Sequence, residues 1–90
     1  MHEMSLLRGL MAQIETIARQ NGAIRVRVVR LKLGPLACIA ADHLREHFLA
    51  AARGTAAEAA QLEIETTDEL HELSLQSIDV ETPTSVLGKS

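Results

Sequence analysis

The chain has 90 residues, a formal net charge of −3, and Phe48 as its only aromatic residue among Phe, Tyr and Trp. This length predicts one small domain, and the charge and scarcity of aromatic rings argue against nucleic-acid binding. Cys38 is the only cysteine, so no disulfide within the chain and no Cys-based zinc site can form. The absence of a long apolar run argues against a membrane span or signal peptide, and we expect a cytoplasmic protein.

Residues 4–20 show the apolar spacing of an amphipathic helix, with a stripe made of Leu7, Leu10, Met11, Ile14, Ile17 and Ala18. Asn21-Gly22 supplies the left-handed stop that helix ends favour. Gly9 is inside the helix, where it lowers helix stability, and we expect it to mark a close approach to another backbone.

Residues 23–33 alternate as a strand, but the apolar phase slips between Val28 and Val29. A β-bulge would repair this slip, and a strand covered on both sides is the alternative. Gly34-Pro35 ends the strand.

A second helix is predicted over residues 40–53, with Leu44, Phe48, Ala51 and Ala52 as its core stripe. Strands follow at 61–66 and 72–81, the latter with a second phase slip at Gln76-Ser77. The short link 67–71 predicts a hairpin between these two strands. The tail, residues 82–90, contains Pro83 and Gly88 and is predicted to be disordered.

The element order α-β-α-β-β predicts an α/β (α+β) fold, with two helices and a small mixed three-stranded sheet in a domain of residues 1–81. The strand-helix-strand unit should be a parallel crossover. So small a sheet has two exposed edges, which could support a homodimer or strand exchange.

Charge is divided unevenly along the chain. Residues 1–57 hold eight Lys and Arg against four Asp and Glu, whereas residues 58–90 hold eight acidic residues against Lys89 alone. This division could form a bipolar surface that orients a partner. Two separately solvated surfaces are the simpler interpretation.

The chain start, Met1-His2-Glu3, places three nitrogens within reach of one metal ion. These are the Met1 amine, the His2 amide and the nearer His2 ring nitrogen, which together form fused five- and six-membered chelate rings. Three coplanar nitrogens suit Ni(II) or Cu(II) and leave one coordination position open. A frayed terminus is the alternative interpretation of the tripeptide alone.

Several segments resemble the HypA/HybF family of nickel-insertion proteins for [NiFe] hydrogenases. They are the start Met1–Leu6, the strand end Leu31–Gly34 with Leu36–Ile39, Phe48, Gly54-Thr55, Leu62–Ile64 and the final strand Glu72–Glu81. The resemblance implies that Met1, His2 and Glu3 bind nickel, with a HypB-type GTPase and the hydrogenase large subunit as partners.

The chain departs from the family between its last two predicted strands. Family members normally carry a zinc-binding loop there with two Cys-x-x-Cys pairs, and this chain has only the link 67–71. A tetrahedral zinc site needs four Cys or His ligands, so we expect no zinc. His71, in the link, is a speculative fourth nickel donor, although an exposed loop histidine is the simpler interpretation.

The sequence therefore predicts a nickel metallochaperone for hydrogenase maturation, or for urease, with no catalytic residues of its own. The alternative is an assembly module of the same fold that lost metal transfer with the zinc loop. His43 and His47 have a spacing that can chelate a metal, but partly exposed boundary residues are the simpler interpretation. Cys38 is expected to be buried near the second helix.

Overall fold

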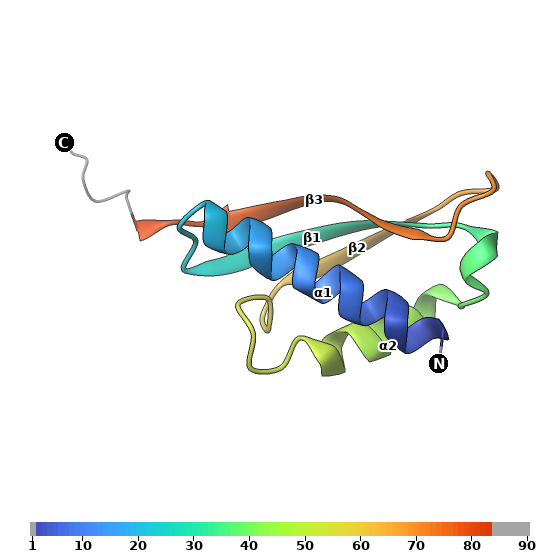
Figure 1. Cartoon of the computed structure of the whole chain (residues 1–90), viewed down its shortest axis with the longest axis horizontal. Helices are drawn as coiled ribbons and strands as arrows, with labels where there is room; N and C mark the ends of the chain where they lie inside the picture. Colours follow the sequence, from blue (N-terminus) through green and yellow to red (C-terminus); the bar gives the residue numbers. More distant parts are fainter. Residues whose placement is uncertain (1, 84–90) are drawn as a thin grey trace.

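The computed structural model describes the backbone of residues 2–83 and the side chains of residues 5–83. The elements, in chain order, are α1 (His2–Gln20), β1 (Arg25–Leu33), the short 3-10 helix η1 (Pro35–Ala37), α2 (Ala41–Ala51), β2 (Gln61–Thr66) and β3 (Leu73–Glu81). Both helices lie on one side of a three-stranded sheet (Figure 1). The expected mixed α+β fold is confirmed, and most of the predicted tail, 84–90, lies outside the described residues.

The strand order β2-β1-β3 places β1 at the centre of the sheet. β2 pairs with β1 in parallel, as the predicted crossover requires, and β3 pairs with β1 antiparallel. The predicted hairpin between the last two strands is wrong, because the link after β2 crosses the end of β1. Because β1 lies between β2 and β3, the link spans two inter-strand distances, about 10 Å in total. A link of this length can cross β1 as easily as it can close a hairpin.

Two register shifts between β1 and β3 account for the phase slips in the sequence. Val26 pairs with Val80 and Val28 with Asp79, so Arg27 is the extra residue on β1. Arg30 pairs with Ser77 and Leu31 with Leu75, which makes Gln76 the extra residue on β3. Both predicted bulges are therefore present, and the first restores Val29 to the buried face.

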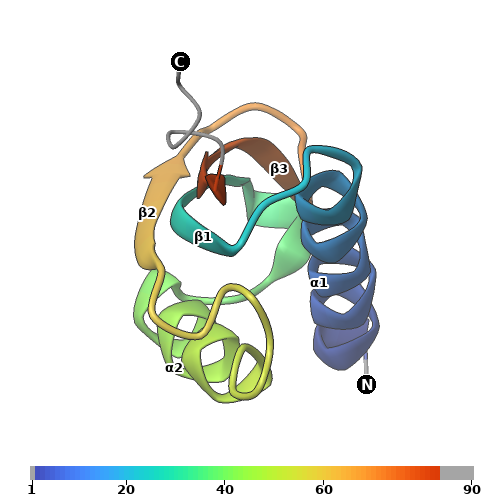
Figure 2. The ribbon, with the colours of Figure 1, turned by 90° about the vertical axis from the view of Figure 1, so that its left-hand side faces the viewer.

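The core lies between the sheet and the two helices, with α1 over the β3 side and α2 over the β2 side (Figure 2). The largest fully buried side chains are Phe48, Leu7, Ile14, Leu31, Leu44, Val26 and Val29. Most of both helix stripes is confirmed, but Ala51 is exposed and Ile17 is only half-buried, outside the core. Ala52 is buried.

The end of α1 has the hydrogen bonds expected from its sequence. Gly22 has φ +64°, and the Ala23 N–H donates to the Ala18 carbonyl at 2.9 Å. The Asn21 side chain donates to the Ile17 carbonyl at 2.7 Å. These bonds satisfy carbonyls that a helix end otherwise leaves unpaired.

The expectation for Gly9 is wrong: no atom outside its own turn lies within 4 Å of where a Cβ would stand. The close approach occurs instead at Gly34, against the backbone of His71. The two glycines differ because Gly9 faces outward from a helix, whereas Gly34 lies beneath the link that crosses β1.

Candidate metal centre and its surroundings

Of the residues predicted to bind nickel, His2 and Glu3 have their backbone in the first turn of α1. The helix begins at His2, and the first N–H groups of a helix have no carbonyl partner within it. Helix hydrogen bonding therefore does not compete for the His2 amide nitrogen. Met1 and the side chains of His2 and Glu3 lie outside the described residues, so their role stays a prediction.

His71, the speculative fourth donor, is held in the link between β2 and β3. Its Nε2 lies 2.9 Å from the Ser74 Oγ, and its carbonyl accepts a hydrogen bond from the Leu36 N–H at 3.0 Å. Its imidazole is partly buried. Metal binding by His71 would require its Nδ1 or the loss of the Ser74 contact.

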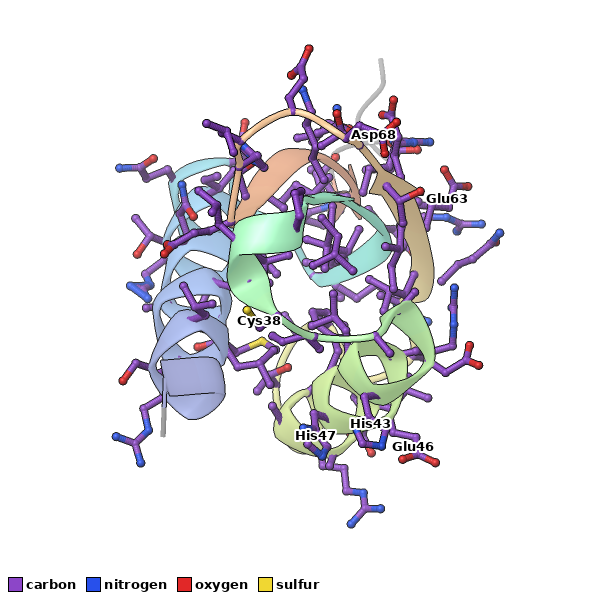
Figure 3. All side chains as sticks on the ribbon, turned by 90° about the vertical axis from the view of Figure 1, so that its right-hand side faces the viewer. Cys38, His43, Glu46, His47, Glu63 and Asp68 are labelled. Atoms are coloured by element: carbon purple, nitrogen blue, oxygen red, sulfur yellow. The ribbon has the colours of Figure 1, made fainter. Side chains whose placement is uncertain are left out.

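The link and the start of α1 are at the same end of the long axis but on opposite sides of it. The link crosses the sheet end, whereas α1 begins in the helix layer (Figures 1 and 3).

Cys38 is exposed, which corrects the prediction that it is buried. It follows η1 in the left-handed conformation, with φ 55°, and its thiol lies 3.7 Å from the Pro35 carbonyl. Its neighbour Ala37 fills the buried position instead. The left-handed turn rotates the chain after η1, so the apolar pattern of 36–39 does not predict which side chain faces inward.

His43 and His47 stand next to each other on α2 (Figure 3). Their ring centroids are 5.8 Å apart and their planes differ by 27°. His43 is exposed and His47 half-buried, as expected for boundary residues. Among residues with described side chains, no group of three His, Cys, Asp or Glu is placed to hold a metal ion.

The sheet face away from the helices carries a charged cluster centred on Arg30. The Arg30 guanidinium binds Asp79 through two hydrogen bonds, of 3.0 and 3.1 Å, and Glu63 through one of 3.1 Å. These partners hold the pKa of Arg30 above its usual value, and the Arg30 hydrogen bond lowers the pKa of Asp79. Composition alone gave no sign of this three-strand cluster, because it depends on strand order.

The basic and acidic residues, which are separated along the sequence, lie side by side in the folded chain. Basic residues of β1 pair with acidic residues of the later chain, as Arg25 does with Glu81 and Lys32 with Glu69. The described surface does not separate into one basic and one acidic half along the lines of the sequence.

The comparison with protein families identifies the relatives of this chain. Residues 1–78 match the family described as "Hydrogenase/urease nickel incorporation, metallochaperone, hypA". The chain belongs to the HypA family. The match begins at residue 1 and therefore includes the predicted nickel donors of the chain start.

Individual HypA proteins support the assignment. The chain is 43% identical over 68 residues to a hydrogenase maturation factor HypA of Chlorobium luteolum, covering 76% of this chain and 58% of that protein. It is 45% identical over 64 residues to the factor of Azotobacter vinelandii, covering 71% and 57%. The chain thus matches little more than half the length of these HypA relatives.

The fold agrees with that of a solved HypA structure. The solution structure of the Ni metallochaperone HypA from Helicobacter pylori superposes with a TM-score of 0.75, covering 91% of this chain and 99% of that chain. Sequence identity is 17%, so this likeness supports the HypA fold alone. Of the helices that the structure describes, none combines the length and apolar character needed to cross a lipid bilayer.

Proposed function

We propose that this chain is a nickel metallochaperone of hydrogenase maturation that binds Ni(II) at its own N-terminus. The Met1 amine, the His2 amide and the His2 imidazole form the planar chelate, and Glu3 supplies a nearby carboxylate. The observation that carries this proposal is the match to a nickel-incorporation family from residue 1 onward. Three nitrogen donors in a plane suit Ni(II), and the metal is cargo, with no turnover by the chain itself.

The fourth coordination position is open to a donor from elsewhere. His71 remains the candidate within the chain, through its Nδ1, because Nε2 is in contact with Ser74. A donor from a partner protein would fill the same position and would favour transfer of the ion.

We also propose that the chain holds no structural zinc. Its 90 residues include one cysteine, and the link between β2 and β3 spans only residues 67–72. Four Cys or His ligands at one centre are needed for such a site. Zinc analysis of the purified chain should therefore find far less than one ion per molecule.

The expected partners are a HypB-type GTPase and the hydrogenase large subunit, with urease maturation as a second pathway, in the cytoplasm. β2 and β3 are both edge strands, which supports the prediction of a homodimer or strand exchange. Measurement of molecular mass in solution at several concentrations tests this part.

The test of the nickel proposal is Ni(II) titration of the untagged chain, with retention of Met1 verified by mass spectrometry. In wild type, one bound Ni(II) should show the visible absorption of a planar nitrogen chelate. His2→Ala should weaken binding more than about 100-fold, because it removes a direct ligand. Gln13→Ala, at an exposed position of α1 outside the proposed site, is the control, and equal titrations of wild type and His2→Ala would refute the site.

A second candidate function is an assembly module that binds maturation proteins but does not transfer metal. The short link between β2 and β3, residues 67–72, favours considering it, because the resemblance to the family implies a zinc-binding loop at that place. Hydrogenase activity in cells that carry His2→Ala distinguishes the two. Full activity without added nickel would favour the assembly module, whereas activity restored only by added nickel would favour the metallochaperone.

A further inference from the structure

The pair of histidines on α2 has the spacing of a chelate. His43 and His47 are one helical turn apart, and neighbours at this spacing lie on the same face of a helix. Their ring centroids are 5.8 Å apart, and the rings are within 27° of parallel. Two imidazoles on one tetrahedral ion, with metal–nitrogen distances of about 2.0–2.1 Å, have centroids about 5 Å apart. The rings are stacked, so both side chains must rotate to point one nitrogen each at a shared ion.

The helix that carries this pair is firmly packed. Leu44 and Phe48 each follow one of the histidines in sequence, and both are fully buried against the core. Arg45 donates to the Leu62 carbonyl of β2 at 2.9 Å, which ties the same turn of α2 to the sheet. Because the backbone is fixed, bringing the two imidazoles onto an ion orders only side chains.

Acidic side chains accompany the pair. Asp42 and Glu46 are exposed, and each precedes one of the histidines by one position. Figure 3 shows Glu46 beside His43 on the outer face of α2. The Glu46 carboxylate beside the His43 imidazole favours a divalent cation over an anion.

The order of residues 43–47 is that of an H-x-x-E-H metal helix, in which both histidines bind zinc. Such catalytic sites need a third protein ligand, and the described side chains contain no group of three that could hold a metal. The pair therefore fits a binding site with several open coordination positions, and it does not fit a hydrolytic centre.

We propose that His43 and His47 form a surface site for a divalent late transition metal, separate from the chain start. The ion is held by the two imidazoles and completes its coordination with water. Imidazole pairs favour Ni(II), Cu(II) and Zn(II) over Mg(II) or Ca(II). The site is exchangeable, because two protein ligands leave the ion open to competing donors.

The test uses the full, untagged chain with His2→Ala, so that the chain-start chelate is removed. Ni(II) and, separately, Zn(II) are titrated by calorimetry into this protein and into the same protein with His43→Asn or His47→Gln. Either added substitution should weaken binding at least tenfold. Gln13→Ala in the same background is the control, because Gln13 is an exposed residue of α1 outside both proposed sites, and it should leave the affinity unchanged.

A second measurement locates the bound ion. In the His2→Ala protein, substoichiometric Ni(II) should broaden the NMR ring signals of His43 and His47 before those of His71. Equal affinities in all four proteins, or broadening centred on His71, would overturn the proposal. The planar Ni(II) absorption, compared between wild type and His2→Ala, tests only the chain-start site. The proposal for His43 and His47 can therefore be wrong while the chain-start proposal holds, and the reverse.

Discussion

Gly34 lies directly beneath the backbone of His71. A Cβ on Gly34 would stand 2.6 Å from the His71 Cβ and 2.7 Å from its carbonyl carbon, and closer still to the carbonyl oxygen. The Gly34 N–H donates to the Glu72 carbonyl at 2.8 Å, and the Leu36 N–H donates to the His71 carbonyl. The link from β2 to β3 is therefore fastened onto the end of β1, and only a residue without a side chain fits below it.

Gly34→Ala should lower the stability of the fold. Gly34 has an extended backbone, so the cost comes from overlap with His71 rather than from backbone strain. Overpacking of this kind costs about 1–3 kcal/mol, and two of the three nearest atoms belong to the His71 backbone, which yields little. Urea unfolding followed by circular dichroism measures the change.

Gly9→Ala is the matched control, because the space around Gly9 is open. Alanine at this position in α1 should raise the unfolding free energy by about 0.5–1 kcal/mol. Equal effects of the two substitutions would show that the link does not press on Gly34 in solution.

Phe48→Ala should be among the most damaging substitutions in the core. Phe48 is the largest fully buried side chain, and truncation of such a residue costs about 3–5 kcal/mol. Leu49→Ala, at the next position of α2, should cost much less, because Leu49 is 48% exposed. Thermal unfolding of both variants measures the difference in stability. Similar losses of stability would show that the Phe48 face of α2 is not the face packed against the core.

Asp79 should make the stability of the protein depend on pH in the acidic range. Its Arg30 hydrogen bond lowers its pKa in the folded state, so Asp79 stabilises the fold fully above the usual Asp pKa. This contribution is lost as the pH falls through the lowered pKa. Below about pH 4, wild type should lose stability more steeply than Asp79→Asn, by a modest amount because both partners are exposed.

The control for this pH dependence is Asp68→Asn, since the structure gives Asp68 no ion pair with any described side chain. In this variant, the unfolding free energy should fall with decreasing pH as steeply as Asp79 makes it fall in wild type. If the unfolding free energy falls equally steeply with decreasing pH in wild type and in Asp79→Asn, the bidentate contact between Asp79 and Arg30 is contradicted.

Cys38 should react readily with a maleimide in the native protein. It is exposed on the turn after η1, so reaction does not require unfolding. The rate should differ by only a few fold between native and urea-unfolded chain, as read by mass spectrometry. Strong protection in the native state would restore the prediction of a buried cysteine.

Much of the fold is readable from residue spacing. The stripe through Leu7 and Ile14 predicts α1, and the slip at Val28-Val29 predicts a real bulge. Strand order is different, because a link as short as 67–72 fits both a hairpin and a crossing over β1. The inward position of Ala52 rather than Ala51 also depends on how α2 meets the sheet, which periodicity leaves uncertain by one residue.

The candidate nickel site was predicted in another way. Its donors come from the chemistry of the chain start and from the family resemblance, and the family match supports them without describing their geometry. The contact between Arg30 and Asp79 was not predicted, because the bulge at Arg27 shifts which residues of β1 and β3 lie opposite each other. The environment of Cys38 was mispredicted for a similar local reason, a left-handed residue after η1.

The central place of β1 also has a consequence for synthesis of the chain. Arg25, the first residue of β1, pairs with Glu81, the last residue of β3. During synthesis, the β3 side of β1 therefore stays unpaired until residues up to about Glu81 have left the ribosome. Such distant pairing slows folding and prolongs exposure of an unpaired edge, so a nascent chain that stops after β2 should be prone to aggregation.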